Sequence, residues 1–312
     1  MDVFRNVVSL EHQAQAAYDA QLYQEASVLH SRAMVAAQHH DSRLVAALCL
    51  RLGETLSADQ SMLDAVTVYE AGFQSCCAAT ALDVTRLLTS LQSVGPYFYR
   101  FDRMDQPCHD DPATAEVLQG TMDDPILPAR LLIACAEEYE RQSSLYLALY
   151  TYKRALDHLQ APTVTELRVD ILSRLGALAY RQGELTTVDA ALSELVELWL
   201  STTNPHLLCH ILAALGELYE AVGSVENALS VYREAVKISL STSDAAAIGR
   251  ARGRLVRLST QQHAAQRGQR TTRQDQPRSV DLPLPAPREV PVETPLRQRV
   301  FAEPVYLDAA RR

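Results

Sequence analysis

The chain has 312 residues, of which 47% are hydrophobic, 21% are charged and only 11 are glycine. This composition supplies enough apolar side chains for a large folded body and few residues that interrupt helices, so we expect a mostly helical protein. No run approaches the roughly 18 apolar residues of a membrane helix, which argues against a membrane protein.

The net charge of −9 is unevenly distributed. Residues 250–312 contain 13 arginines and 6 acidic residues, a net charge of +7, which leaves −16 for the preceding 249 residues. Acidic surfaces repel phosphate backbones, so nucleic acid is disfavoured as a partner of the main body. Residues 1–6 include charges and no long apolar stretch, so we expect no targeting segment and a cytoplasmic location.

Six cysteines are scattered along the chain without paired CxxC spacing. They are Cys49, Cys76, Cys77, Cys108, Cys135 and Cys209. Three fall in helical patterns beside alanine and leucine, and we interpret the cysteines as small buried hydrophobic residues. Neither disulfides, nor a metal, nor any other cofactor is expected.

A pattern of small and aromatic residues recurs along the chain. A small residue, which we call the marker, is followed by alanine at +12, tyrosine at +16 and a second small residue at +19. The complete copies are Gly53, Ala65, Tyr69, Gly72; Ala136, Ala148, Tyr152, Ala155; and Gly216, Ala228, Tyr232, Ala235. Internal repeats of this kind predict a stack of similar units rather than one globular core.

The markers are Ala14, Gly53, Ala136, Gly176 and Gly216, at intervals of 39, 83, 40 and 40 residues. The long interval is close to two periods, which predicts a degenerate unit within it. Each unit contains two amphipathic stretches of helical length divided by a short turn, which predicts an antiparallel helix pair.

The expected domain organisation is an all-α body over 1–260 and a Pro/Arg-rich flexible tail over 261–312. The expected units are 7–40, 42–75, an irregular 76–125, 126–160, 164–200, 206–240 and a terminal helix over 244–260.

Glycine inside a helix costs about 1 kcal/mol relative to alanine, so the interior markers indicate helices that cross closely. Ala65, Ala148 and Ala228 are expected to face the markers. The tyrosines at +16 are expected to fill the space where one pair meets the next, with their hydroxyls reaching an edge.

On these residues the chain resembles the tetratricopeptide repeat superfamily, in its form of roughly 40 residues that occurs in kinesin light chains. The residues that carry the resemblance include Leu52-Gly53, Leu175-Gly176, Leu215-Gly216, Tyr180, Gly183, Tyr219, Gly223, Asn227 and Leu229. It covers about 200 of the 312 residues. The resemblance implies a right-handed α-solenoid of antiparallel helix pairs. His30 departs from the pattern in the aromatic place, as do Val188, Leu192 and Leu195 in the fourth clear unit.

In this family the first helices of the pairs line a concave groove that binds partners. The resemblance and helical spacing predict these partner-binding residues: Glu54, Arg130, Ile133, Glu137, Glu140, Ser173, Tyr180, His210, Glu217 and Glu220. The same spacing places Glu11 on this face. The lining is mostly acidic and lacks the Lys, Arg and Asn set of a carboxylate clamp, which argues against that activity. The alternative is that these glutamates only solvate helix faces.

Two features interrupt the repeats. Residues 97–101 contain four aromatics, which either fill a gap in the solenoid or bind a ligand. The stretch Cys108-His109-Asp110-Asp111 contains metal-ligand types, yet an aspartate before Pro112 is a typical helix start, and we favour the helix start.

The tail ends in a segment with apolar anchors between basic residues. Arg297, Arg299, Phe301 and Tyr306 are the expected anchors for docking, either in the protein's own acidic groove or on a partner. The alternative is a solubilising tail without structure.

No nucleophile, phosphate-loop or metalloprotease motif is present, and we expect a protein without enzymatic activity. The leading hypothesis is a scaffold that binds a peptide or helix of another protein. The alternatives are a regulatory sensor of a peptide or small effector, and a self-assembling structural component.

Overall fold

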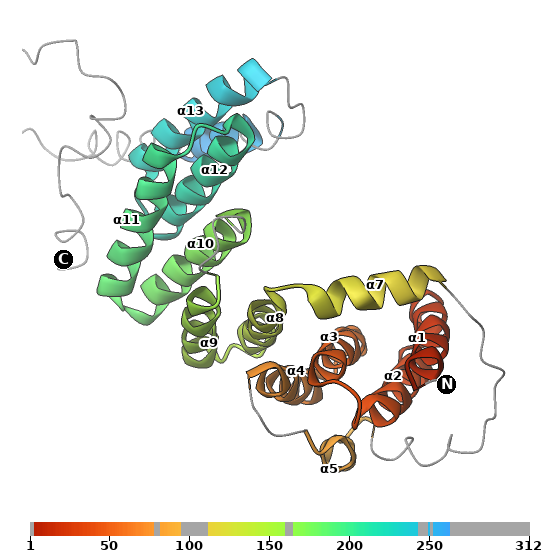
Figure 1. Cartoon of the computed structure of the whole chain (residues 1–312). Coiled ribbons are helices and arrows are strands. Elements are labelled where there is room, and N and C mark those ends of the chain that lie inside the picture. The colour runs from red at the N-terminus through yellow and green to blue at the C-terminus, as the bar shows by residue number, and fades with distance from the viewer. Residues whose placement is uncertain are drawn as a thin grey trace, which may run out of the picture. The chain divides into compact units, whose positions relative to one another are not determined.

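The computed structural model describes residues 3–77, 82–94, 112–159, 165–242, 249 and 252–262. All regular secondary structure in these ranges is helical, so the described part of the chain is all-α as predicted (Figure 1). None of the described helices combines the length and the apolar character needed to cross a lipid bilayer. The chain divides into two compact units: residues 1–171 with 181–183 form unit 1, and residues 172–180 with 184–312 form unit 2.

Unit 1 is built from helix pairs. Their bounds are α1 Val3–Asp19 and α2 Tyr23–Ala37, α3 Ser42–Ala58 and α4 Met62–Cys77, and α8 Leu127–Arg141 and α9 Leu145–Asp157. The members of each pair pack against each other, and successive pairs meet where α2 packs on α3 and α4 packs on α8. Two further helices, α5 Val84–Ser90 and α7 Pro112–Asp123, come from the irregular region.

Unit 2 continues with the same design. Helix α10 spans Thr165–Gln182 and contributes its residues 172–180 to this unit, followed by α11 Leu185–Ser201, α12 Pro205–Ala221 and α13 Val225–Thr242. Helix α12 packs against both α11 and α13. Residues 252–262 are also helical, and we call them the arginine helix because they contain Arg252, Arg254 and Arg257.

The turn within each pair repeats at one position. Residues Gln21, Gln60, Ser143, Gly183 and Gly223 have φ between 60° and 79°, and each lies seven residues after the marker of its unit. The following backbone N–H donates to the carbonyl five residues earlier, as in Ser144 N to Tyr139 O at 2.8 Å and Ser224 N to Tyr219 O at 2.8 Å. This bond is typical of a helix end closed by a left-handed residue. The repeat is therefore present in the backbone as well as in the sequence.

The core of each pair is formed by the small and aromatic positions of the repeat. Ala65, Ala148 and Ala228 are fully buried, and the rings of Tyr69, Tyr152 and Tyr232 are 3%, 0% and 1% exposed. The contact partner of the marker differs from the prediction. A Cβ added at Gly53 would overlap the ring of Tyr69, and one at Gly216 would overlap the ring of Tyr232.

In these two pairs the tyrosine ring is therefore the nearest neighbour of the marker glycine. The physical reason is that a flat ring fills the gap left by a missing side chain better than a methyl group does. Gly176 differs again, because a Cβ there would lie 2.7 Å from Cδ1 of Leu218 on α12.

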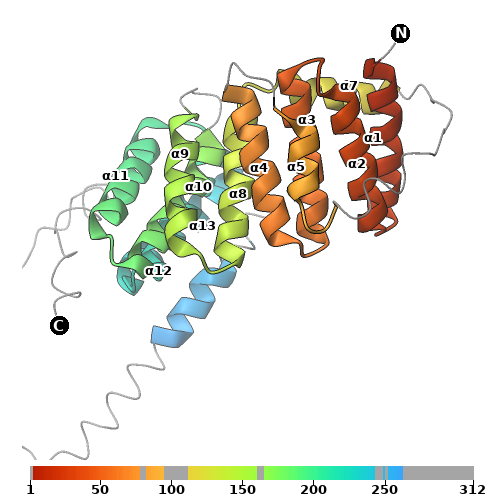
Figure 2. The same ribbon diagram turned by 90° about the horizontal axis from the view of Figure 1, so that it is seen from below.

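The described helices of the irregular region, α5 and α7, do not lie between α4 and α8. Helix α8 packs directly on α4, whereas α5 packs on α2, and α7 packs on α1 and α3 (Figures 1 and 2). Within the described residues of the long interval, these two helices therefore pack on the first two pairs, and the degenerate unit stays a prediction.

Polar contacts attach two points of the irregular region to the helix pairs. The buried Asp64 carboxylate accepts hydrogen bonds from Gln92 N at 3.1 Å and Ser93 N at 2.7 Å, after the end of α5. Arg43 on α3 donates to the carbonyl of Asp124 at 3.3 Å, after the end of α7. Helix α7 begins at Pro112, as predicted. The aromatic residues 97–101 and the stretch from Cys108 to Asp111 lie outside the described residues.

Candidate functional site

Acidic side chains occupy two repeated positions on the first helices of the pairs. These positions are +1 and +4 from the marker, three residues apart, and so they share one helix face. They hold Glu137 and Glu140 on α8, and Glu217 and Glu220 on α12, while α3 has Glu54 at +1. Glu54 and Glu217 are exposed, and the other three are half-buried. The face at +1 and +4 of the first helices is the candidate site.

Tyrosine hydroxyls from the second helices hold the glutamates at +4. Tyr232 donates to Glu220 Oε1 at 2.9 Å, and Tyr152 donates to Glu140 Oε2 at 3.4 Å, with the same sequence separation of 12 residues. Burial, and then the hydrogen bond to Glu220, raises the pKa of Tyr232 well above its usual range. The hydroxyl therefore remains a donor and fixes one oxygen of the carboxylate.

In unit 1 the surroundings of Glu54 have mixed charge. Burial by surrounding protein raises the pKa of Glu54, although the positive charges of Arg51 and Arg130 oppose this increase. The Glu54 side chain nonetheless remains accessible to water. Arg130 is also exposed and forms an ion pair with Asp124 at 3.3 Å. This part of the candidate site is therefore not uniformly acidic, contrary to what a count of glutamates suggests.

The first pair contains a buried variant of the tyrosine–glutamate contact. His30 takes the place of the tyrosine, and its Nδ1 lies 2.7 Å from Glu11 Oε1. Both side chains are buried, with exposed fractions of 3% and 5%. Glu11 is thus part of the packing between α1 and α2, and it is not an accessible residue of the predicted groove.

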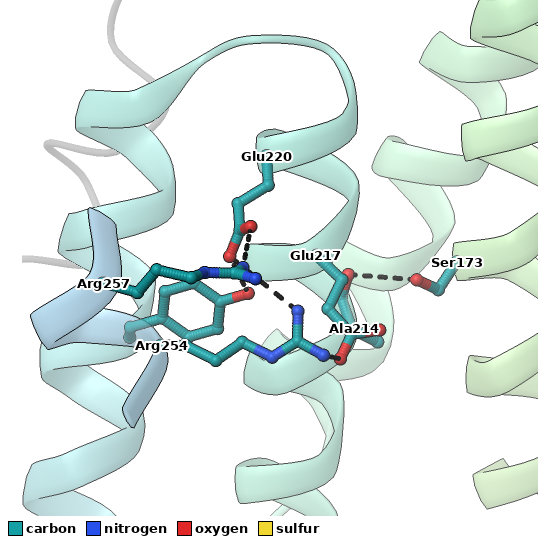
Figure 3. A network of polar contacts seen from close by, with 7 residues as sticks. Ser173, Ala214, Glu217, Glu220, Arg254 and Arg257 are labelled. Atoms are coloured by element: carbon teal, nitrogen blue, oxygen red, sulfur yellow. Dashed lines mark hydrogen bonds and ion pairs between the residues drawn. The ribbon is translucent and has the colours of Figure 1, made fainter. Parts of the chain in front are cut away.

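In unit 2 the arginine helix lies against the acidic pair of α12 (Figure 3). Arg254 contacts Glu217 Oε1 at 2.6 Å and Glu220 Oε1 at 3.8 Å, and Arg257 contacts Glu220 Oε2 at 2.5 Å. These arginines are not among the site residues predicted from the sequence. The signal that could have found them is their spacing of three residues, which matches the spacing of the two glutamates.

The remaining predicted residues have different surroundings. Ile133 and His210 are half-buried, and Tyr180 is exposed on α10. Ser173 differs from its predicted role, because it is buried and its hydroxyl donates to the carbonyl of Ala214 on α12 at 3.2 Å (Figure 3). Ser173 thus connects two first helices within unit 2. The predicted anchors Arg297, Arg299, Phe301 and Tyr306 lie outside the described residues.

The described cysteines are free thiols in different environments. Cys49, Cys135 and Cys209 are buried as predicted, whereas Cys76 is half-buried and Cys77 is exposed, which corrects the prediction for these two. Burial raises the pKa of the Cys135 thiol to about 12 and that of Cys76 to about 11. Within the described ranges, no group of three or more His, Cys, Asp or Glu side chains is arranged to hold a metal ion.

No protein-family model matches the sequence, and a search of curated proteins finds no match. The similarity to the tetratricopeptide repeats therefore stays a prediction based on the repeat pattern.

Proposed function

We propose that the protein is a non-enzymatic scaffold of tetratricopeptide type, a right-handed α-solenoid that binds a peptide or helix of a partner protein on the first helices of its pairs. The observation that carries this proposal is the repeated glutamate face. In two pairs, a tyrosine that fills the core also holds a glutamate at +4 on the accessible side of the first helix.

The physical argument is one of preorganisation. A carboxylate held by a buried tyrosine loses little further side-chain freedom when it binds a cationic or hydrogen-bonding group, so less free energy is lost on association. Each unit presents one such group, Glu140 in unit 1 and Glu220 in unit 2, on a helix face that suits an extended or helical ligand. Membrane and nucleic-acid partners are not proposed, and a cytoplasmic location remains a prediction.

Site-specific photo-crosslinking tests the proposal. A benzoylphenylalanine is placed at Glu54 or Tyr180, which are exposed on first helices, and at Leu63 or Leu200 as matched controls that are exposed on the second helices α4 and α11. The proposal predicts that the first-helix positions crosslink the same protein and that the controls do not. Equal crosslinking from all four positions would refute a binding face on the first helices.

One observation favours the alternative of self-assembly. Helix α9 exposes three large hydrophobic residues, Tyr146, Leu147 and Tyr150, at 68%, 43% and 55%. Exposed apolar patches of this kind often mark interfaces between proteins. Light scattering of the wild-type chain and the Y146E/Y150E variant distinguishes self-assembly from the scaffold function. Self-assembly through α9 requires a larger mass for wild type than for the variant at high concentration. A sensor function has no comparable support.

A further inference from the structure

We infer that the acidic pair on α12 is a receptor for an amphipathic helix with two arginines one turn apart, and that the arginine helix is its exchangeable occupant. A partner with the pattern Arg-Leu-x-Arg-Leu, as in residues 254–258 of this chain, binds by displacing it. This inference rests on the proposed function and specifies the chemistry of the partner.

The charged half of the contact is a register match between two helices. Glu217 and Glu220 are three residues apart, and so are Arg254 and Arg257. Arg254 reaches both carboxylates, at 2.6 Å and 3.8 Å, while Arg257 contacts only Glu220. Guanidinium groups are well suited to bridge carboxylates, because their N–H donors lie in one fixed plane. The pair thus recognises arginines at one particular spacing.

Tyr232 fixes the position of one of the two carboxylates, so the pair is an ordered site rather than two mobile surface side chains. Its hydroxyl donates to Glu220 Oε1. Arg257 binds Oε2 of the same carboxylate (Figure 3). The Tyr232 hydroxyl therefore holds one oxygen of Glu220, and the other oxygen binds the guanidinium of Arg257. Only 17% of its side chain is exposed, so the arginine contact is partly shielded from water.

The leucines of the same segment give it an apolar side. Leu258 is 5% exposed and Leu255 is half-buried, whereas Val256 is 58% exposed. The arginine helix is therefore amphipathic: one side is buried and the other faces water. Binding of a helix through an apolar stripe with charged flanks is a common mode of peptide recognition.

The arginine helix is suited to exchange because the arginine side of its ion pairs remains open to solvent. The side chains of Arg254 and Arg257 are 40% and 54% exposed. Exposed ion pairs contribute little to stability and are screened by salt. The short segment buries only one side chain fully, Leu258, so a partner helix with a longer apolar stripe competes effectively.

The experiment measures binding of a fluorescent peptide of residues 249–262 to the full chain by anisotropy. In the R254E/R257E chain, charge repulsion releases the intramolecular helix and leaves the acidic pair accessible. We expect the peptide to bind this variant at least 10-fold more tightly than it binds wild type. Adding E217Q/E220Q to that variant should reduce the affinity at least 10-fold, since glutamine still accepts the Tyr232 hydrogen bond and only the charges are lost.

Two matched controls separate recognition from general attraction between a basic peptide and an acidic protein. The first replaces Glu194 and Glu197, which have the same spacing on α11, by glutamine and should leave the affinity unchanged. The second is a peptide of identical composition with the two central arginines moved to adjacent positions, which should bind at least 10-fold more weakly. The inference would be overturned if replacing Glu194 and Glu197 reduced the affinity as much as replacing Glu217 and Glu220 does. It would also be overturned if the rearranged peptide bound as tightly as the original peptide.

A lack of peptide binding to the R254E/R257E chain would also overturn it. The proposed function would then still be decided separately by crosslinking from Glu54, which lies in unit 1 and does not depend on this peptide.

Discussion

In each unit a further helix of the same chain contacts a first helix of the pairs, and we call this helix the cover of the unit. The covers of the two units differ. In unit 1, α7 packs on α1 and α3, and its Leu118 and Met122 are part of the hydrophobic core. In unit 2, the arginine helix contacts α12 through exposed ion pairs and fully buries only Leu258 among its own side chains. Similar pairs can therefore carry a cover that is part of the fold or one that is held weakly. The difference lies in how much apolar surface each cover buries.

The largest expected effect distinguishes the two covers. Leu118→Ala creates a cavity in the core of unit 1, and we expect it to lower the free energy of unfolding by about 3 kcal/mol. Leu258→Ala removes a similar side chain from a short peripheral helix, and we expect local loss of protection without a comparable loss of global stability. Urea denaturation of both variants measures this. A global loss from Leu258→Ala as large as that from Leu118→Ala would show that both covers are integral.

The next largest losses of stability are expected at the marker glycines, which test whether the helix pairs of the two units are alike. Gly53→Ala and Gly216→Ala force the added methyl group against a buried tyrosine ring. Overpacking outweighs the gain in helix propensity, so we expect each to destabilise by about 1–2 kcal/mol. Gly120 in α7 has open space around it, and Gly120→Ala is a matched control that should stabilise by about 0.5–1 kcal/mol. A neutral result at Gly53 with a loss at Gly216 would mean that the pairs are not equivalent.

Substitutions in the turns between helices also compare the two units, with smaller expected changes in the free energy of unfolding. Ser143 in unit 1 and Gly223 in unit 2 both have positive φ, at 60° and 79°, and glycine adopts this conformation without steric cost. We expect Ser143→Gly to raise the free energy of unfolding by about 0.5–1 kcal/mol and Gly223→Ala to lower it by about 1 kcal/mol. Thermal unfolding of the two variants checks the opposite signs. A decrease for both would argue against a common turn.

The smallest effect concerns the acidic residue of unit 1. Because burial raises the pKa of Glu54 above its ordinary 4.5, the folded state binds its proton more tightly than the unfolded state does. Stability therefore falls as the pH rises from about 4.5 through the raised pKa. Glu54→Gln should raise stability at pH 7 by less than about 1 kcal/mol, since solvent screens this exposed group.

The gain from Glu54→Gln should vanish at a pH well below 4.5, where glutamate is protonated in both states. In unit 2, by contrast, Glu217→Gln removes an ion pair with Arg254 and should increase hydrogen exchange in residues 252–262. Melting curves of Glu54→Gln at several pH values provide the test, and a gain that grows on acidification would contradict the assigned cause.

The sequence predicted what depends on local pattern. Markers, alanines and tyrosines recur at helical spacing, and this was enough to predict the helix pairs and the buried Tyr152 and Tyr232. It was not enough to predict which side chain meets Gly53, because two small residues and a ring compete for that space and packing between helices decides among them.

Contacts between distant segments could not be predicted from the sequence. The packing of α7 on α1 joins residues about 100 positions apart, and no periodicity encodes it. The Arg257–Glu220 contact spans 37 residues. Residues 252–262 form too short a segment for hydrophobic periodicity to reveal where they dock. The sequence named Glu217 and Glu220 as partner-binding residues, which stays a prediction, and their arginine partners had to be seen in three dimensions.

Hydrogen exchange of the full wild-type chain, with and without an excess of the 249–262 peptide, tests most directly that a partner helix binds the first-helix face of α12. The account predicts faster exchange in residues 252–262 on peptide addition, unchanged exchange in α7, and protection of α12 retained. Peptide binding that leaves exchange in residues 252–262 unchanged, or that exposes α7 instead, would contradict it.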